Sequence, residues 1–270
     1  MKKPDKNRTR DLFFKIQEVY NKSPLTCKEL TTALRIENII NSNAIENNII
    51  DSIFFQPGIY RGNIRVKEFS NPVYRKAFLE VKSHDRMLQY LEKNALKKAE
   101  LTISFLLKIH QLLFEKSWPD IAGRFRDIDV RIRGIKLRPP HYLQIHEIIY
   151  QHLTWIDGLL KLMGPVSPGN FFEIFHVAAD IQRRIIHTYP FRDGNWRIAR
   201  ALTDYVLLYC GMTYCVIDYR RRDEYLTTIE NSTITDFSAL EDFLLDSYGT
   251  TLKRLNGFIN LAMQTDDLMQ

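Results

Sequence analysis

The sequence predicts an all-α protein with one small β-hairpin. Several segments carry apolar residues at the three-to-four-residue spacing of an amphipathic helix, and one segment alternates apolar with charged residues instead. The 270 residues, 45% apolar and 26% charged, are also enough for one large globular domain or a domain with a small appendage.

The predicted helices span residues 28–50, 74–97, 101–116, 169–187 and 197–210. Each has apolar residues along one stripe, as in the last of them, where Ile198, Ala201, Leu202, Tyr205 and Leu208 recur at helical spacing. Residues 163–169, MGPVSPG, form a loop that is too short to separate two domains.

The predicted hairpin lies in residues 124–140, RFRDIDVRIRGIKLRPP. Ile128, Val130 and Ile132 alternate with charged residues before Gly134, and the segment ends at two prolines. This alternation around a glycine is typical of two short antiparallel strands.

The charge and the cysteines narrow the class of protein. The formal net charge of +6 is spread along the chain, so it indicates acidic partners only weakly, and without a zinc, helix-turn-helix or RNA-binding signature we expect no nucleic acid partner. Cys27, Cys210 and Cys215 are odd in number and unrelated in spacing, which favours a reducing, cytoplasmic environment. With neither a secretory leader nor a long apolar run, we expect no membrane association.

The stretch between the last two predicted helices, IIHTYPFRDGNWRIAR at 185–200, resembles an anion site. Free N–H groups at a helix start attract phosphate, and Arg197 and Arg200 add positive charge on one face. Asp193 could hold a Mg²⁺ that bridges phosphate oxygens. The alternative is that Asp193 caps the helix and both arginines form surface ion pairs.

A longer pattern favours the anion site. Residues 189–200, YPFRDGNWRIAR, resemble the Fic family signature H-P-F-x-D/E-G-N-G-R-x-x-R with two departures. The family's preceding helix and G-x-y-R turn, its flap and its late helix are similar to IHQLLFEKSWPDIAGRFR, VRIRGIKLRPP and RRRDEYLTTIE. Upstream, INSNAIENN resembles the inhibitory motif S-x-x-I-E-G-N, with Ser42 and Glu46 matching and Asn47 in place of glycine.

The resemblance implies a Fic-like helical bundle that binds ATP with Mg²⁺ and transfers AMP to a Ser, Thr or Tyr hydroxyl of a target protein. It implies that Asp193 binds the metal, that Gly194 and Asn195 form the anion hole, and that Arg197 faces the nucleotide phosphates. It has Arg200 meet either the γ-phosphate or the inhibitory Glu46. The flap residues that would dock the target are Val130, Arg131, Ile132 and Arg133.

The first departure is Tyr189, which stands where the family has its catalytic histidine. A phenol with a pKa near 10 is a poor base at neutral pH, since only about one in a thousand is ionised. Neighbouring arginines could lower that pKa. His187 is a second candidate base, although a histidine there could instead bind carbonyls at the end of the helix.

The second departure is Trp196, which replaces a family glycine. If the backbone there needs a positive φ, the indole costs about 1–3 kcal/mol. Otherwise it could cover the phosphate pocket, point to a partner, or pack under the flap or the helix at 28–50.

We therefore expect one compact unit in which residues 1–95 form an N-terminal helical region and residues 96–270 the Fic-like core. The predicted function is an impaired or atypical AMP transferase, inhibited by Glu46. The alternative is a non-catalytic scaffold that binds a protein through a basic flap of Arg124, Arg126, Arg131, Arg133, Lys136 and Arg138. A homo-oligomer is possible on either hypothesis.

Overall fold

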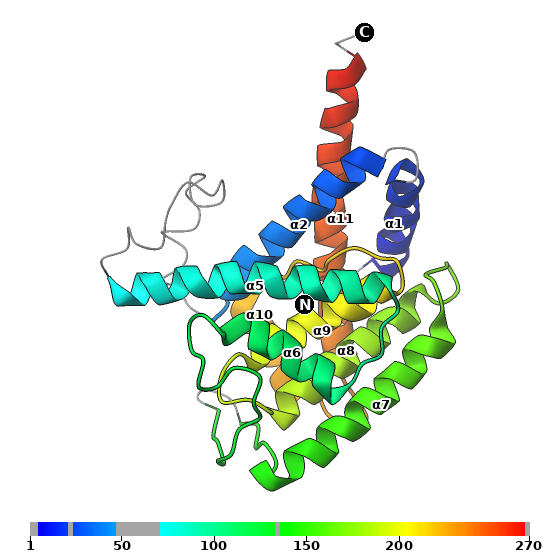
Figure 1. The fold of residues 1–270 in the computed structure, drawn as a ribbon. Helices are drawn as coiled ribbons and strands as arrows, with labels where there is room; N and C mark the ends of the chain where they lie inside the picture. Colours follow the sequence, from blue (N-terminus) through cyan, green and yellow to red (C-terminus); the bar gives the residue numbers. More distant parts are fainter. Residues whose placement is uncertain (1–4, 21–23, 47–70, 133–135, 268–270) are drawn as a thin grey trace.

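Helices make up the regular structure of the protein in the computed structural model, which describes residues 5–20, 24–46, 71–132 and 136–267 (Figure 1). They are α1 (Lys6–Tyr20), α2 (Pro24–Ala44), α5 (Pro72–Leu96), α6 (Ile103–Phe114), α7 (Ile145–Met163), α8 (Phe171–Thr188), α9 (Asn195–Tyr209), α10 (Arg222–Asn231) and α11 (Ser238–Asp267). Two short 3-10 turns, Tyr142–Gln144 and Tyr219–Arg221, precede α7 and α10. The predicted all-α class is confirmed.

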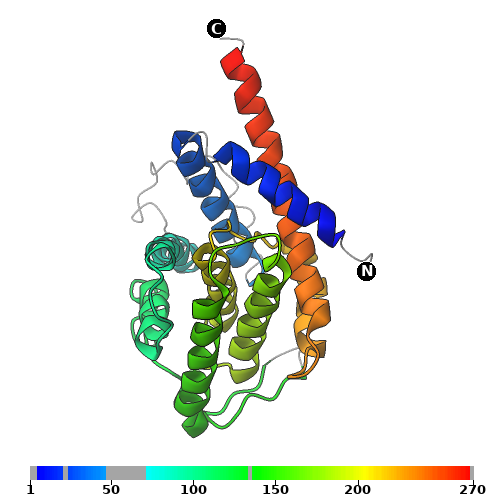
Figure 2. The same ribbon diagram turned by 90° about the vertical axis from the view of Figure 1, so that its right-hand side faces the viewer.

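Helix α9 is the centre of the molecule. Its residues are buried on every side, which is typical of a helix enclosed by others. Helix α8 packs along it so closely that Thr203 Oγ1 lies 3.3 Å from the carbonyl oxygen of Ala178. Helices α5 and α2 pack against other parts of α9, and α7 covers the outer side of α8 (Figures 1 and 2).

Local sequence signals set the ends of these helices. Asn71 accepts a hydrogen bond from Val73 N ahead of Pro72, and Thr102 accepts one from Phe105 N, so both residues cap the helices that follow. Helix α8 ends at Tyr189, which is in the left-handed conformation.

The predicted helices correspond to α2, α5, α6, α8 and α9, and the late helix expected from the family resemblance corresponds to α10. The helix predicted at 28–50 ends at Ala44, and residues 47–50 lie outside the described part of the chain. Helices α1, α7 and α11 were not predicted. For α7 the signal was present, because Ile145, Ile149, Leu153, Ile156 and Leu160 follow helical spacing and are buried.

The predicted β-hairpin is wrong for the residues that can be described, since 124–132 and 136–140 contain no strand. The main reason is Arg126, whose buried guanidinium donates hydrogen bonds to the carbonyls of Ile128 and Pro140. It therefore joins the two arms of the flap through a side chain rather than through a strand ladder. Two strands without further partners are only marginally stable in water.

Helices α1 and α11 pack together on one side of the bundle, and α11 extends beyond it (Figure 2). Among the described residues, no helix is both long enough and apolar enough to cross a lipid bilayer. The expected boundary between residues 95 and 96 falls at the end of α5 and stays a prediction.

Candidate functional site

The turn between α8 and α9 is fixed in an unusual backbone conformation. Tyr189 has φ 48° and ψ 59°, and its N–H donates to the Ile185 carbonyl at 2.8 Å. Arg126 holds the turn from the other side, because its Nε donates to the Tyr189 carbonyl and its backbone N–H to the Pro190 carbonyl, both at 2.8 Å. The arginine of the G-x-y-R turn thus positions the loop.

Gly194 and Asn195 shape the start of α9. Gly194 has φ 77°, and a Cβ there would lie 2.5 Å from Cε2 of Phe114, so only glycine fits. The side chain of Asn195 accepts from Phe191 N and donates to Phe191 O, each at 2.9 Å. In this structure the Asn195 amide supports the turn.

His110 ties the same loop to α6. It stacks on Phe191 with ring centroids 3.8 Å apart, accepts from Gly123 N through Nδ1 at 3.0 Å, and donates from Nε2 to the Asp193 carbonyl at 3.1 Å. Burial lowers the pKa of His110 to about 4, so the ring is neutral at pH 7. These contacts position the loop.

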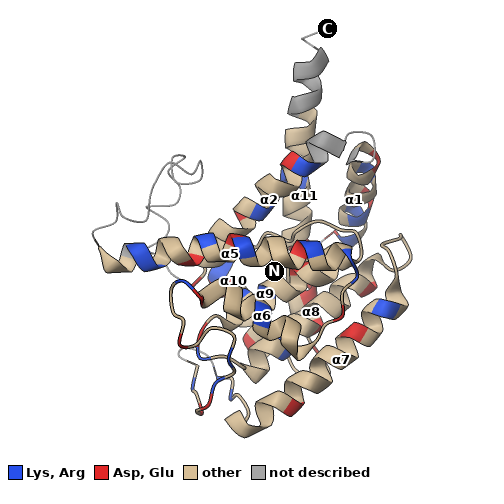
Figure 3. Cartoon of the chain, in the orientation of Figure 1, with Lys and Arg blue, Asp and Glu red and all other residues tan. Residues whose placement is uncertain are grey.

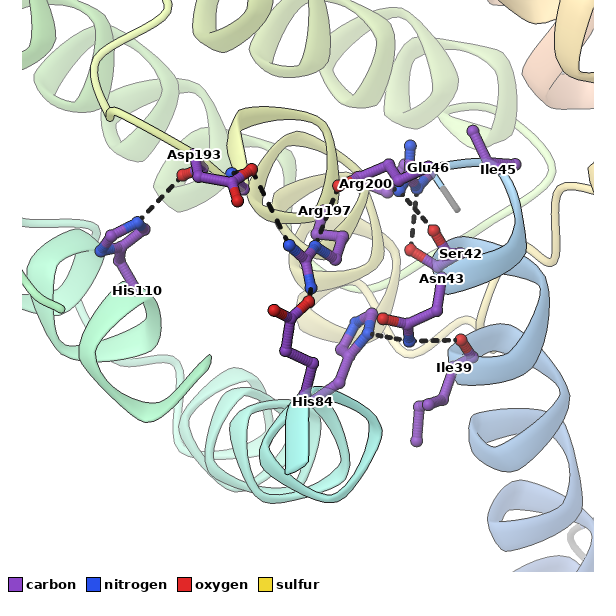
Figure 4. A network of polar contacts seen from close by, with 12 residues as sticks. Ile39, Ser42, Asn43, Ile45, Glu46, His84, His110, Asp193, Arg197 and Arg200 are labelled. Atoms are coloured by element: carbon purple, nitrogen blue, oxygen red, sulfur yellow. Dashed lines mark hydrogen bonds and ion pairs between the residues drawn. The ribbon is translucent and has the colours of Figure 1, made fainter. Parts of the chain in front are cut away.

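Both arginines of the motif bind the carboxylate of Glu46 (Figure 4). Arg200 Nη2 lies 2.7 Å from Glu46 Oε1, and Arg197 Nε lies 3.0 Å from Oε2. Arg200 also donates from Nε to Ser42 Oγ and from Nη2 to the Ser42 carbonyl, both at 2.8 Å. The two residues of the inhibitory-like motif therefore meet the arginines directly.

A second carboxylate, from α5, binds Arg197. Glu80 Oε2 accepts from Arg197 Nη1 at 2.6 Å, and Asp193 Oδ1 lies 3.9 Å from Nη2. Burial would lower the pKa of the Arg197 guanidinium, but Glu46, Glu80 and Asp193 raise it above its usual value. The alternative of surface ion pairs is wrong for Arg197 and Arg200, which are only 4% and 5% exposed.

Three further polar side chains seat the end of α2 on the core. Asn38 donates to Asp204 of α9 at 2.6 Å, and Asn43 donates to Nδ1 of His84 at 2.9 Å. Asn41 Oδ1 accepts from the Tyr219 N–H at 3.1 Å. These residues are buried, so α2 docks in part through polar groups that have found partners.

Tyr189 lines a cavity of about 550 Å³ beside Glu46, Asp193, Trp196 and Ile132. The pKa of its phenol is raised, first by burial and then by the charges of Glu46 and Asp193. The expectation that neighbouring arginines lower this pKa is therefore wrong. Their charge is already matched by carboxylates.

His187 lies away from Tyr189. Helix α8 continues through Thr188, and His187 Nε2 lies 3.1 Å from Ser232 Oγ and 3.3 Å from the Ile229 carbonyl. Burial lowers the pKa of His187. These contacts join α8 to the end of α10, and His187 is not among the residues that line the cavity.

Trp196 sits in the first turn of α9 without backbone strain. In the described residues, Lys98 and Tyr189 are the non-glycine residues with positive φ, so the cost considered for an indole at position 196 does not arise. The indole packs edge-on against Tyr225, with ring centroids 5.7 Å apart, and it also lines the cavity.

Asp193 is the candidate metal ligand. Its Oδ1 accepts from Gly194 N at 2.6 Å, and the side chain is 40% exposed. Among the residues that can be described, no group of three or more His, Cys, Asp or Glu side chains could hold a metal ion. A single exposed carboxylate suits Mg²⁺, which binds through one or two carboxylates together with phosphate oxygens and water.

The flap presents mixed chemistry. Val130 and Ile132 are half-buried, Arg131 is exposed, and Arg133 lies outside the described residues. Because Arg126 is buried, it does not belong to the expected basic surface. Acidic residues are interspersed with the remaining basic ones along the flap, as they are along α5 (Figure 3).

Comparison with known proteins shows which family part of this chain resembles. Residues 100–207 match the model of the Fic/DOC family. Within the solved structures, a Fic domain-containing signaling protein of Bacteroides thetaiotaomicron has a TM-score of 0.75 at 22% identity, covering 93% of this chain and 97% of that one. Residues 134–508 of Fic-1 from C. elegans give 0.72 at 17% identity, covering 94% and 73%. Residues 100–207 are thus similar to a Fic/DOC domain, and the solved structures share the fold of the chain.

Curated relatives carry the name of an activity. The protein adenylyltransferases Fic of Drosophila grimshawi and Drosophila virilis are 23% and 24% identical over 173 residues, which is 64% of this chain and 34% of each relative. The chain thus spans about a third of the length of these relatives.

Proposed function

We propose that this protein is a Fic-type AMP transferase, inhibited by Glu46 and impaired by Tyr189. The observation that carries the proposal is the single Glu46 carboxylate bound to both Arg197 and Arg200, at 3.0 and 2.7 Å. A carboxylate is an anion held where the arginines would otherwise meet phosphate oxygens. The activity of the curated relatives supplies the reaction class.

ATP with Mg²⁺ fits the residues present. The N-terminal N–H groups of α9, Arg197 and Arg200 would bind phosphate oxygens, and the exposed carboxylate of Asp193 would hold the ion. Bound Mg²⁺ would neutralise phosphate charge as the bond to the pyrophosphate breaks. Glu46 has to leave the arginines before they can do this, because its oxygens lie against Arg197 Nε and Arg200 Nη2.

Tyr189 explains why the transfer would be slow. The base must remove a proton from the target hydroxyl, and a phenol whose pKa is raised above its usual value is almost wholly protonated at pH 7. Loss of a positioned general base costs about 10²- to 10⁴-fold in rate. His187 offers no replacement, since its ring binds Ser232 and Ile229.

Incubation with labelled ATP and Mg²⁺ tests the transferase directly. We expect weak or no self-labelling by the native protein and strong labelling by Glu46→Gly/Tyr189→His/Trp196→Gly. The matched control is Glu46→Gly/Trp196→Gly, which keeps the phenol and should label about 10²-fold more slowly or worse. Vigorous labelling by the native protein would contradict the impaired state, and no labelling by the triple variant would contradict the transferase itself.

The target would dock at the flap and offer a Ser, Thr or Tyr hydroxyl beside Tyr189. Ile132 supports this placement because it belongs both to the flap and to the cavity that contains the phenol. Residues 1–95 would serve as the inhibitory region, since they supply Glu46 and Ser42.

A second candidate is a non-catalytic scaffold. A hollow of about 580 Å³ lies in the flap itself, lined by Val130, Arg131, Leu137 and their neighbours. An extended peptide could lie there against backbone groups that have no strand partner in the described part of the flap. No binding of Mg²⁺ and ATP by Glu46→Gly would favour the scaffold over the enzyme.

A further inference from the structure

Glu80 is a carboxylate that no family motif in the sequence predicted. It lies on α5, 117 positions before Arg197, and its Oε2 accepts from Arg197 Nη1 at 2.6 Å. The two side chains are 13% and 4% exposed, so this is a buried pair. Its attraction is weakened little by water or salt, in contrast to a pair on the surface.

The carboxylates next to the two arginines outnumber them. Arg197 and Arg200 contribute two positive charges, and Glu46, Glu80 and Asp193 contribute three negative ones. Burial, together with the two guanidinium charges, lowers the pKa of nearby His84 well below its usual range, so the ring adds no positive charge. Lys76 Nζ lies 3.8 Å from Glu80 Oε1, but its side chain is 48% exposed and largely hydrated.

Glu46 and Glu80 differ in how they are held. Glu46 follows the last residue of α2 in a turn, so movement of that one helix end removes it from the arginines. Glu80 lies within α5 among the buried residues Ala77, Phe78 and Val81. Its backbone is held in place by a core helix, so Glu80 remains beside Arg197 when Glu46 is withdrawn.

We propose that Glu80 is a specificity-determining residue of the phosphate site, a fixed negative charge on Arg197 that weakens the binding of nucleotides in proportion to their phosphate charge. This inference rests on the proposed nucleotide site. With Glu46 withdrawn, Arg197 and Arg200 are still matched in number by Glu80 and Asp193. Since Coulomb repulsion grows with the charge of the ligand, ATP loses more affinity to Glu80 than ADP does, and ADP loses more than AMP.

The test compares Glu46→Gly with Glu46→Gly/Glu80→Gln by titration calorimetry with ATP, ADP and AMP. Mg²⁺-free buffer is used so that ligand charge rises in the order AMP, ADP, ATP. A glutamine at position 80 can still accept the Arg197 hydrogen bond and removes only the charge. We expect it to tighten ATP about tenfold or more and AMP about threefold or less. Equal factors for the three nucleotides, or no change, overturn the proposal.

The matched control is Asp85→Asn in the Glu46→Gly background. Asp85 is also a carboxylate of α5, but it pairs with Arg35 at 3.0 Å, so the affinity for every nucleotide should stay the same. Glu46→Gly/Glu80→Ala removes the charge by a second route and should tighten ATP in the same direction if the glutamine variant fails to fold.

The outcomes also separate this proposal from the transferase. If Glu80→Gln tightens ATP as expected while the labelling variants stay inactive, the site binds nucleotides without transferring AMP. If Glu46→Gly binds ATP and glutamine at 80 has no effect, only the role of Glu80 is wrong. If no variant binds any of the three nucleotides, with Mg²⁺ present as well, both proposals are overturned.

Discussion

Helix α9 has two neighbours that hold it in different ways. Against α8 it packs closely with fully buried apolar residues on both helices, among them Ala178, Ile181, Ala199 and Leu202. Against α2 the hydrogen bonds and ion pairs are made by Asn38, Ser42 and Glu46, next to the buried apolar residues Leu34 and Ile39.

This difference indicates which part of the site can move. Apolar surface exposed to water costs free energy in proportion to its area, so the α8–α9 contact has no favourable open state. Buried amides and ion pairs lose less on opening, because water replaces their hydrogen bonds. We therefore interpret α8 and α9 as the fixed frame of the anion site and the end of α2 as its removable cover.

The largest effect is expected from Leu202→Ala, which breaks the apolar side of the comparison. Leu202 is 0% exposed, and deletion of a buried leucine side chain costs about 2–5 kcal/mol in free energy of unfolding. Urea denaturation measures it. Leu162→Ala is the control, since Leu162 is 86% exposed and should change stability by less than about 0.5 kcal/mol. Equal losses in the two variants would contradict the assignment of the core.

The pH dependence of stability tests the polar contact between α2 and α9. Burial raises the pKa of Asp204 from 3.8 to about 7, although the hydrogen bonds from Cys215 N and Asn38 act to lower it. Because the folded pKa lies above the unfolded one, this carboxyl adds stability below pH about 4 and loses that contribution as the pH rises to about 7. Asp204→Asn should remove this loss, which is on the order of 1–4 kcal/mol.

The native protein and Asp204→Asn have to be compared, because buried histidines change the stability with pH in the opposite direction. The pKa values of His110 and His152 are lowered to about 4 in the folded protein. The stability that each neutral ring contributes is therefore lost as the pH falls below about 6.5. Both contribute equally to the native protein and the variant, and the difference between the two stability curves isolates Asp204. A difference that does not change between pH 4 and 7 would contradict the raised pKa.

A smaller effect is expected from Asn43→Ala at the seat of α2. The change removes the donor to His84 Nδ1, and an unsatisfied buried acceptor costs about 1–3 kcal/mol. Hydrogen exchange should show faster opening of the amides of α2 than of those of α8. Asn94→Ala is the control, because Asn94 bonds to Tyr90 within its own helix. Equal acceleration in both helices would mean that α2 does not open separately.

The smallest effect is expected from Glu37→Gln, which breaks the partly exposed pair between α2 and Arg254 at 2.5 Å. The two side chains are 29% and 32% exposed, and pairs of this kind contribute at most about 1 kcal/mol. Thermal unfolding measures the change. A loss as large as that in Leu202→Ala would show that surface charge, not buried contacts, holds α2.

The sequence predicted the two helices that flank the site but not the conformation of the flap. Periodicity reports which face of a segment is buried, and it located α8 and α9 to within a few residues. In the flap, the alternation of apolar and charged residues predicted that Arg126 is one of several exposed basic residues. Its role comes from the carbonyls of Tyr189 and Pro140, which only the folded chain brings to it.

Some residues of the candidate site were also predicted from the sequence, and others were not. Glu46, Arg197 and Arg200 were named from motifs, and the structure brings them together. Glu80 carries no local signal, because its partner is 117 residues away and an isolated glutamate in a helix is ordinary. The raised pKa of Tyr189 was also unpredictable, since it depends first on the burial of the phenol and then on the charges of Glu46 and Asp193 beside it.

The affinity for ATP with Mg²⁺, measured by titration calorimetry on the native protein and Glu46→Gly, tests the central claim most directly. The claim is that one carboxylate occupies the arginines in place of phosphate, so removing it should tighten binding by about tenfold or more, which is about 1.4 kcal/mol. Glu37→Gln, a charge change on the same helix away from the arginines, should leave the affinity unaltered. Equal affinities of the native protein and Glu46→Gly would contradict the account.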